Sequence, residues 1–250
     1  MKIAKLGDRG EIFLSVQGEG KSSGRPSVFV RTSLCNLHCV WCDTDYTWNW
    51  VGTPFAHNRD SEPGYQKFRQ DEQIVEMTPA EVAEAVLRFD CRNVVLTGGE
   101  PMLQHEGLTA VMQQLRAVDA GFRFEVETNG TIEPPAEFDA QIDQYNVSPK
   151  TSNSGNAARL RRKGGALRFF AASPKATFKF VVASAADLEE IRELAGAFDV
   201  PAERIYLMPE GTDSETLQRR GSWLAGECEK RGYRFSDRLH IHEFGNRRGV

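Results

Sequence analysis

The chain has 250 residues, of which 40% are hydrophobic and 26% charged, and a net charge of −4. This composition is typical of one soluble α/β domain and excludes a chain-wide basic field that would bind nucleic acid directly. Residues 1–20 lack the long apolar run of an export signal, and no later segment approaches the ~20 apolar residues of a membrane span. Five cysteines in such a chain predict metal or redox chemistry in the cytoplasm.

Helix and strand signals alternate along the chain. The predicted strands are 27–32, 93–96, 122–127, 145–147, 177–182, 204–207 and 238–241. The predicted helices are 79–89, 104–118, one within 156–170, and two that begin at the capping sequences 184–187 and 212–215. Repeated βα units demand right-handed crossovers and a parallel sheet, which both a doubly wound sheet and a barrel satisfy. The number of units falls short of a full eight-unit barrel.

No domain linker or internal repeat interrupts this series. We therefore expect a single domain, 1–250, with a long irregular insertion at about 46–77 that is rich in aromatic residues, Gly, Pro and charge. Long irregular segments of this kind are usually functional lids or partly mobile. The basic stretch 159–168 is interpreted as a solvated helix face.

Three cysteines fall within eight residues, at Cys35, Cys39 and Cys42. Three thiolates at this spacing can bind one iron–sulfur cluster, which normally takes four cysteines, so that one iron keeps an open position for a small chelating ligand. Cys91 and Cys228 lie at a predicted helix end and inside a predicted helix. We interpret these two as small buried hydrophobic residues.

Polar residues follow several of the predicted strands. Thr97-Gly98-Gly99-Glu100-Pro101 comes directly after strand 93–96; its glycines let the backbone approach a ligand, and Glu100 can accept hydrogen bonds from an ammonium group. Alone, this sequence is more often a strand-end turn. The other strand-end residues are Thr128-Asn129, Ser148-Pro149-Lys150, Pro209-Glu210 and His240. Because the carboxyl ends of parallel strands form the active-site face of such folds, we expect these residues to meet there.

Gln17, Glu19 and Arg31 form a further candidate group. The side chains of Gln17 and Glu19 can form hydrogen bonds with the donor and acceptor groups along the edge of a heterocycle. The planar guanidinium of Arg31 can bind a carboxylate through two nitrogens, and no acidic residue close in sequence is placed to pair with it. The alternative is a polar loop and a surface arginine.

Asp43-Thr44-Asp45 directly follows the last of the three cysteines. Oxygen ligands of this kind suit Mg²⁺, which often shares an oxygen of the substrate. An N-cap or an Asx turn is the alternative.

The cysteine motif together with Gly-Gly-Glu-Pro resembles the radical S-adenosylmethionine (SAM) superfamily. The runs F-L-S-V-Q-G-E-G, from Phe13 to Gly20, and F-V-R-T-S-L-C-N-L-H-C-V-W-C-D-T, from Phe29 to Thr44, are similar to the 7-carboxy-7-deazaguanine synthase family. The resemblance extends over nearly the whole chain, from Glu11 to R-L-H-I-H at 238–242. The cysteines identify only the superfamily; Q-G-E-G and C-D-T narrow it to this family.

The resemblance implies an incomplete parallel (β/α)6-type barrel that forms a homodimer. It implies a 4Fe–4S cluster, SAM and Mg²⁺ as cofactors, and a reductant such as flavodoxin. The implied substrate is 6-carboxy-5,6,7,8-tetrahydropterin, whose ring is contracted with release of ammonia to 7-carboxy-7-deazaguanine for queuosine-type nucleosides. A 5′-deoxyadenosyl radical formed from SAM abstracts hydrogen from the substrate, and SAM is regenerated.

The resemblance also implies roles for individual residues. Cys35, Cys39 and Cys42 would bind the cluster; Trp41, Cys42, Asp43, Gly99, Glu100, Ser148, Pro149, Lys150, Met208, Pro209, Glu210 and Gly211 would contact SAM; Val16, Gln17, Gly18, Glu19, Arg31, Thr97 and His240 would hold the pterin; and Thr44 would bind Mg²⁺. Two features limit the transfer. The segment 46–77 is longer than in compact members, and some members use their C-terminus at the substrate, which leaves the role of Val250 open.

Two other interpretations compete with this one. Another radical SAM enzyme, such as one that activates a glycyl-radical partner, would keep the cysteines and Gly-Gly-Glu but give no role to Gln17, Glu19 and Arg31. A zinc-stabilised binding module, for instance one that recognises RNA, would need a fourth closing ligand, for which His38 is the nearest candidate. The net charge of −4 argues against the RNA-binding form.

Overall fold

A mostly parallel sheet runs through the computed structural model, which describes all residues from 1 to 250. Its strand order is β11-β10-β9-β8-β7-β6-β4-β1-β2, with β3 also paired to β4 and β5 to β1. The strands are β1 (Lys2–Leu6), β2 (Arg9–Gly10), β3 (Ile12–Val16), β4 (Pro26–Thr32), β5 (Ile74–Glu76), β6 (Asn93–Gly98), β7 (Arg123–Thr128), β8 (Gln144–Val147), β9 (Ala176–Val182), β10 (Ile205–Pro209) and β11 (Arg234–Phe235). All pairings from β4 to β11 along this path are parallel. The two ends of the sheet do not pair with each other, so the predicted incomplete barrel is confirmed.

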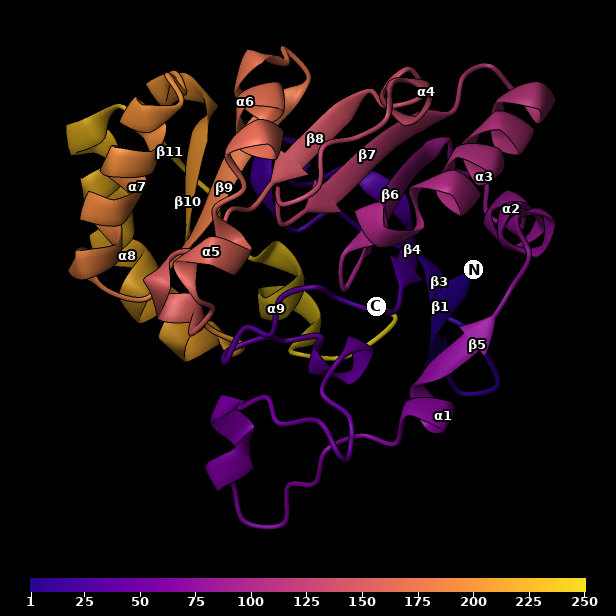
Figure 1. Ribbon diagram of the computed structural model, residues 1–250, viewed down its shortest axis with the longest axis horizontal. Helices are drawn as coiled ribbons and strands as arrows, with labels where there is room; N and C mark the ends of the chain where they lie inside the picture. Colours follow the sequence, from indigo (N-terminus) through magenta and orange to yellow (C-terminus); the bar gives the residue numbers. More distant parts are fainter.

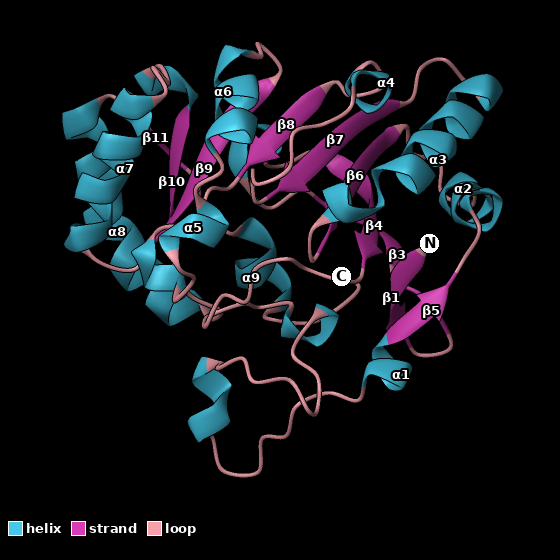
Figure 2. Ribbon diagram, in the orientation of Figure 1, coloured by secondary structure: helices cyan, strands magenta, loops and turns pink.

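Most helices lie along the outside of the curved sheet, whereas α9 and the C-terminal tail lie inside its arc (Figures 1 and 2). The helices are α1 (Gln70–Gln73), α2 (Pro79–Leu87), α3 (His105–Val118), α4 (Ala136–Asp139), α5 (Ala158–Arg161), α6 (Gly164–Ala172), α7 (Ala185–Ala197), α8 (Ser214–Arg231) and α9 (Leu239–Phe244). Thirty-six buried residues from the sheet and the outer helices form one hydrophobic cluster. The outer face of the sheet therefore packs against the helices, and its concave face is available for polar residues.

The predicted capping sequences begin the long helices. Thr78 forms a complete capping box with Glu81 at the start of α2, and Ser184 forms one with Asp187 at the start of α7. At α8 the side chain of Asp213 accepts a hydrogen bond from the backbone N–H of Thr216 at 2.8 Å. These side chains bind N–H groups that have no partner inside the helix, which fixes where each helix begins.

The sequence prediction fails at both ends of the sheet. Residues 238–241 are not a strand: Arg238 is the N-cap of α9, and the last strand is β11. The alternation in L-H-I-H imitates a strand, but one helical turn also buries Ile241 and directs Arg238 into the interior. Strand 27–32 is not the first, because β1, β2 and β3 precede it and pair in antiparallel fashion with their neighbours. The lysines in β1 mask its apolar alternation.

The basic stretch 159–168 lies in two short helices, α5 and α6. Its Arg and Lys side chains are exposed, with the exception of Arg161. Arg161 is buried and forms an ion pair with Glu190 of α7. The interpretation of this stretch as a solvated face therefore holds for the other basic residues only.

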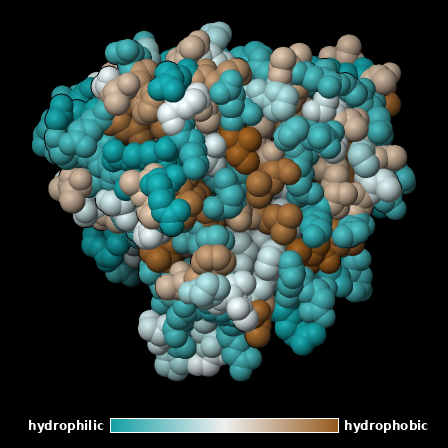
Figure 3. All heavy atoms as spheres, in the orientation of Figure 1, coloured by the Kyte–Doolittle hydropathy of each residue, from teal (hydrophilic) through white to brown (hydrophobic).

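The surface seen in Figure 3 is largely hydrophilic, with hydrophobic side chains gathered near the centre of the view. None of the helices is both long enough and apolar enough to cross a membrane.

Candidate active site

A cavity lies at the carboxyl ends of the parallel strands and is lined by residues from both halves of the chain. The empty space in the cavity and its open mouth, open solvent included, amounts to about 1340 Å³. The predicted residues that line it are Val16, Gln17, Gly18, Glu19, Arg31, Cys35, Cys39, Trp41, Cys42, Asp43, Thr44, Thr97, Gly99, Ser148, Lys150, Met208, Pro209, Glu210, Gly211 and His240. Glu100 and Pro149 are the predicted site residues that do not line it.

The loop that carries the three cysteines leaves β4 through a constrained turn. Leu34 has a positive φ of 75°, which is unusual for a residue with a branched side chain. Its carbonyl accepts a hydrogen bond from the Glu100 backbone N–H at 2.8 Å. A Cβ on Gly99 would lie 2.1 Å from this carbonyl oxygen. Only glycine allows the Gly-Gly-Glu turn to lie against the cysteine loop, which explains its sequence without reference to a ligand.

The residues around the three cysteines fit an iron–sulfur cluster. All three thiols are free and line the same cavity. The Asn156 side-chain amide donates to the sulfur of Cys39 at 3.4 Å, and the buried indole N–H of Trp48, on the same wall, has no hydrogen-bond partner. Sulfur atoms of a cluster would provide acceptors for such donors.

A structural zinc site does not fit. No group of three or more His, Cys, Asp or Glu side chains converges as the ligands of one metal ion must. Cluster thiolates bind separate irons and need not converge on one point. The ring of His38, the nearest candidate for a fourth zinc ligand, stacks on Phe55 with the ring centroids 3.3 Å apart.

The two remaining cysteines lie away from the cavity. Cys228 is buried in α8, as expected. Cys91 is only half-buried, contrary to the expectation, because it lies in the open turn after α2, where its thiol contacts the carbonyls of Pro26 and Asn93.

Glu100 is fully buried behind the cavity wall. Its carboxylate accepts hydrogen bonds from the Thr128 hydroxyl at 2.8 Å, from the Asn129 backbone at 2.7 Å and from the Met102 backbone at 3.0 Å. Burial raises the pKa of this carboxyl, and the two backbone N–H groups oppose that rise. In this structure Glu100 joins β6 to β7 and does not present its carboxylate to the cavity.

Arg31 is held by an acidic residue that the sequence analysis missed. Its Nε donates to Oε1 of the fully buried Glu11 at 2.8 Å, an acidic residue that is not a neighbour of Arg31 in sequence. Glu11 is remote in sequence and comes alongside through the antiparallel pairing of β3 with β4. Arg31 also lines the cavity, and no hydrogen bond occupies its terminal nitrogens.

Gln17 and Glu19 belong to a buried polar network. Gln17 donates its amide to Glu127 at 3.1 Å and to Glu125 at 3.3 Å, and its carbonyl accepts from the Glu19 backbone at 3.1 Å. Thr97 donates its hydroxyl to Glu127 at 2.8 Å. Gln17 thus has a fixed orientation before any ligand binds.

Glu19 lies between two cations that the sequence analysis missed. It forms ion pairs with Lys179 of β9 and with Arg238 at the start of α9. Burial alone would raise the pKa of Glu19, but Lys179 and Arg238 together hold it well below its usual range. Burial likewise favours neutral Lys179, but Glu19 and Glu127 raise its pKa, so both partners are ionised. A lysine within the apolar strand A-T-F-K-F-V-V was the signal that could have identified this pair.

The carboxylates next to Thr44 have protein partners. Asp43 forms an ion pair with Arg238, and Asp45 accepts a hydrogen bond from the Tyr65 hydroxyl at 2.7 Å. The Thr44 hydroxyl lies 3.5 Å from the sulfur of Cys42 and lines the cavity. Thr44 therefore presents its hydroxyl to the cavity, as Asp43 does the oxygen that Arg238 does not bind, whereas Asp45 does not line the cavity.

The end of the chain also reaches the cavity. A Cβ on Gly18 would lie 2.1 Å from Nδ1 of His240, so Gly18 is required for α9 to pack against Q-G-E-G. Burial lowers the pKa of His240, which keeps its ring neutral near pH 7. Val250 lines the cavity.

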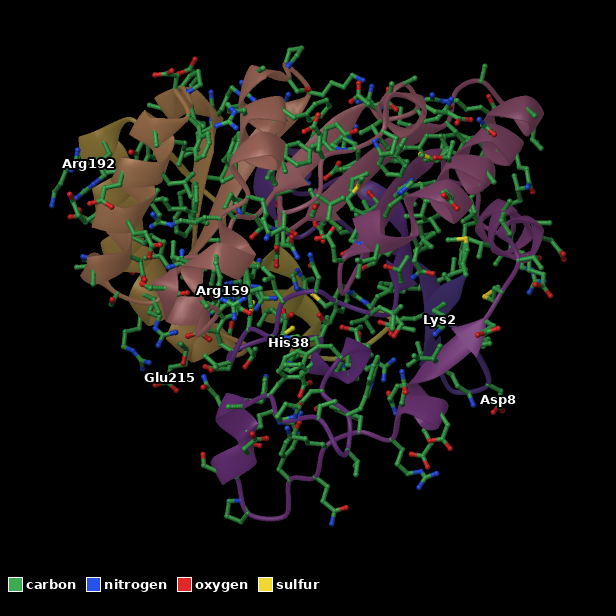
Figure 4. The ribbon with its side chains drawn as sticks, in the orientation of Figure 1. Lys2, Asp8, His38, Arg159, Arg192 and Glu215 are labelled. Atoms are coloured by element: carbon green, nitrogen blue, oxygen red, sulfur yellow. The ribbon has the colours of Figure 1, made fainter.

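The inserted segment packs against the cysteine loop. His57 forms a 2.9 Å hydrogen bond with the Cys42 carbonyl, and the Asn58 backbone donates to the Val40 carbonyl at 2.7 Å. On the other side of the loop, the His38 backbone donates to the Asn156 side chain at 2.9 Å, two residues before α5. Figure 4 labels His38 on this loop and Arg159 on α5. The loop is thus held between the insertion and α5.

Comparisons with known proteins agree with this geometry. A family model described as the radical SAM superfamily matches residues 29–176. A protein named 7-carboxy-7-deazaguanine synthase, from Pyrobaculum aerophilum, is 39% identical and covers 96% of this chain and 95% of its own. A protein of the same name from Rhodopirellula baltica is 36% identical and covers 96% of this chain and 87% of its own. The crystal structure of QueE from Escherichia coli has a TM-score of 0.63 at 25% identity and covers 92% of both chains.

Members of the radical SAM superfamily use a 4Fe–4S cluster and SAM, and they receive electrons from an external reductant. The relatives extend over nearly the whole chain, which separates it from radical SAM enzymes of other kinds. The chain belongs to the radical SAM superfamily and, within it, to the 7-carboxy-7-deazaguanine synthase family.

Proposed function

We propose that this chain is a radical SAM lyase that converts 6-carboxy-5,6,7,8-tetrahydropterin to 7-carboxy-7-deazaguanine and ammonia, in the biosynthesis of queuosine-type nucleosides. The observation that carries the proposal is Arg31, whose Nε is held by Glu11 while its terminal nitrogens are unoccupied in the cavity of the three cysteines. A guanidinium with two free coplanar nitrogens is suited to a carboxylate.

The chain's residues divide the cavity between cofactor and substrate. Cys35, Cys39 and Cys42 would hold the cluster. When bound, the cluster and SAM supply the one-electron chemistry that begins the reaction. SAM would lie against Trp41, Cys42, Asp43, Gly99, Ser148, Pro149, Lys150, Met208, Pro209, Glu210 and Gly211, while Glu100 would act through Thr128 and Asn129. Lys150 supports this arrangement, because its Nζ donates to Ser148 at 2.9 Å and lies 5.6 Å from the centre of the Trp41 ring.

The pterin would lie on the opposite wall. Arg31 would bind its carboxylate, and Val16, Gln17, Gly18, Glu19, Thr97 and His240 would surround its ring. Glu19 and Lys179 form a buried ion pair on this wall, so neither of these two charges is left unpaired near the reacting atoms. Gln17 and Thr97 are both bound to Glu127, so they are preorganised and lose little freedom when the ring binds.

Further parts of the proposal rest on family membership and chemistry. We propose one domain, 1–250, with an insertion at 46–77; the single hydrophobic cluster supports this. Mg²⁺ would bind Thr44 and an oxygen of the substrate, because the Thr44 hydroxyl lines the cavity beside Cys42. A homodimer in the cytoplasm, with flavodoxin as the reductant, completes the proposal; five free cysteines suit a reducing compartment.

The decisive experiment supplies the reconstituted enzyme anaerobically with SAM, a reductant and 6-carboxy-5,6,7,8-tetrahydropterin. Mass spectrometry should detect 7-carboxy-7-deazaguanine, and an ammonia assay should detect one equivalent per product. Wild-type enzyme with a full cluster that leaves the carboxypterin unchanged would refute the proposed function.

A further inference from the structure

One buried carboxylate binds three distant parts of the chain. Glu11, between β2 and β3, has no exposed surface. Its Oε1 accepts hydrogen bonds from Arg31 Nε at 2.8 Å and from the Tyr46 hydroxyl at 3.0 Å. Its Oε2 accepts from Arg248, at 3.2 Å from Nε and 2.7 Å from Nη2. Glu11 therefore joins the cavity wall, the start of the inserted segment and the C-terminal tail.

Arg248 is the residue by which the tail is attached. Its Nη2 also donates to the Lys5 carbonyl at 2.5 Å and its Nη1 to the Gln73 side chain at 3.0 Å. Its guanidinium lies 3.5 Å from the centre of the Tyr46 ring. Two residues later, Val250 lines the cavity. Arg248 thus attaches the tail to Glu11, Lys5 and Gln73 two residues before Val250.

The division of donors between the two oxygens of Glu11 has a consequence for Arg31. Because Arg248 occupies Oε2, Arg31 can use only its Nε on this carboxylate. Without Arg248, the carboxylate is free to rotate and to pair with Arg31 through two parallel hydrogen bonds, the favoured geometry of an isolated Arg–carboxylate pair. That pairing would draw a terminal nitrogen of Arg31 away from the cavity.

The charges around Glu11 also favour an anionic ligand on Arg31. Two arginines share one carboxylate, so the Glu11 cluster carries an excess of one positive charge at the cavity wall. Asp43, the nearest other carboxylate, is already bound by Arg238. A buried excess charge is costly unless it is paired, and an anionic ligand on the terminal nitrogens of Arg31 would pair it.

We propose that Glu11 is a positioning residue that orients Arg31 toward the substrate carboxylate, and that through Arg248 it couples carboxylate binding to docking of the C-terminal tail. The inference rests on the proposed function for the identity of the carboxylate. Linkage requires the coupling to be reciprocal: a carboxylate on Arg31 holds Arg248 and the tail in place, and a docked tail strengthens carboxylate binding.

The test compares Arg248→Met with its neighbour Arg247→Met. Arg247 is exposed, and its side chain donates only to the Phe244 carbonyl, so it serves as a matched control. The reconstituted proteins are compared for iron content, for SAM affinity, and for affinity toward the carboxypterin and toward a tetrahydropterin that lacks the carboxyl group. Arg248→Met should weaken carboxypterin binding by about tenfold, which is ~1.4 kcal/mol. The analogue and SAM should bind as to wild type, and Arg247→Met should match wild type throughout.

A second measurement follows the tail itself. Carboxypeptidase should release Val250 faster from Arg248→Met and from Glu11→Gln than from wild type. Carboxypterin should slow the release from wild type and Arg247→Met but not from Glu11→Gln. If Glu11→Gln does not fold, Arg248→Met alone decides the question, because its side chain lies in the tail.

The outcomes separate this inference from the proposed function. If Arg248→Met, with a full cluster, binds carboxypterin as Arg247→Met does, the coupling is wrong even though the enzyme forms its product. If wild type binds carboxypterin no better than the analogue, the proposed role of Arg31 fails, while the rate of Val250 release still reports whether Arg248 anchors the tail.

Discussion

Lys179 of β9 and Glu19, in the loop after β3, form a buried ion pair although they are 160 residues apart in the sequence. The pair joins β9 to the loop after β3, across the open side of the incomplete barrel. Arg238 binds the other oxygen of Glu19 and also pairs with Asp43. These contacts connect the cysteine loop, the Q-G-E-G loop and the last helix.

Removing one partner of this pair should therefore destabilise the fold. Lys179→Met should lower the free energy of unfolding by about 3 kcal/mol, because Glu19 stays buried with Arg238 as its only close cation. The double variant with Glu19→Gln should lose less than the sum of the single losses, with a coupling of roughly 0.5–3 kcal/mol. Lys230→Met, which breaks an exposed pair with Glu227, should cost less than about 1 kcal/mol. Urea unfolding of the four variants measures this, and additive single losses would show that the two residues do not interact.

The cysteines should separate into two classes. Cys35→Ala, Cys39→Ala and Cys42→Ala should each abolish turnover and lose most of the reconstituted iron and sulfide. Cys91→Ala and Cys228→Ala should keep the full complement, because neither thiol lines the cavity. Iron and sulfide analysis with visible spectra decides the matter. Loss of the cluster in Cys91→Ala would mean that the ligand set is wrong.

Arg31→Lys should weaken binding of the carboxypterin at least about tenfold and leave SAM affinity nearly unchanged. A lysine ammonium is a point charge that cannot hold Glu11 and a substrate carboxylate in one plane. Breaking a buried charge pair can cost ~3–5 kcal/mol, of which lysine retains part. Calorimetric titration with the carboxypterin and with its decarboxylated analogue measures the loss. An equal loss of affinity for both compounds would exclude a specific carboxylate contact.

Local chemistry explains what could be predicted from the sequence. The capping sequences at Thr78 and Ser184, the strand of Val94 to Leu96 and the three cysteines act within a few residues, so their patterns are visible in one dimension. Glu11 and Lys179 act on partners that only the sheet brings alongside, at Arg31 and Glu19. For the same reason Glu100 was expected in the cavity, although its carboxylate is buried behind Thr128 and Asn129, which the strand ends bring alongside and which line the cavity themselves.

A further prediction concerns acid stability and Glu190. Burial by itself raises the pKa of Glu190, but hydrogen bonds from the Ser152 backbone, Arg162 and Arg161 lower it from 4.5 to about 2. A folded-state pKa below the unfolded value stabilises the fold above about pH 4.5, and this stabilisation is lost as the pH falls from there toward 2. Its size should be about 1–2 kcal/mol, allowing for solvent screening.

Glu190→Gln should therefore lower the free energy of unfolding at pH 7 and flatten its decline between about pH 4.5 and 2. Glu193→Gln, on the exposed side of the same helix, serves as the control. Chemical unfolding at a series of pH values measures both. Parallel pH profiles for wild type and Glu190→Gln would remove Glu190 as a source of acid sensitivity.

The last prediction concerns Thr44 and Mg²⁺. The Thr44 hydroxyl lines the cavity next to Cys42, whereas Asp45 accepts a hydrogen bond from Tyr65 and one oxygen of Asp43 is bound by Arg238. One neutral hydroxyl is a weak Mg²⁺ ligand, so the site should be complete only when the substrate adds oxygens. Affinity for the metal and for the substrate should then rise together.

Thr44→Ala should reduce turnover and its stimulation by Mg²⁺ while leaving the iron–sulfur spectrum unchanged. Thr44→Ser keeps the hydroxyl and should recover much of the loss, which a role in packing of the Thr44 methyl group would not predict. Turnover is measured against Mg²⁺ concentration in chelator-treated buffer for wild type and both variants. If Thr44→Ala follows the wild-type Mg²⁺ curve, Thr44 is not a ligand, and the C-D-T sequence at this position is a turn whose hydroxyl contacts only the sulfur of Cys42.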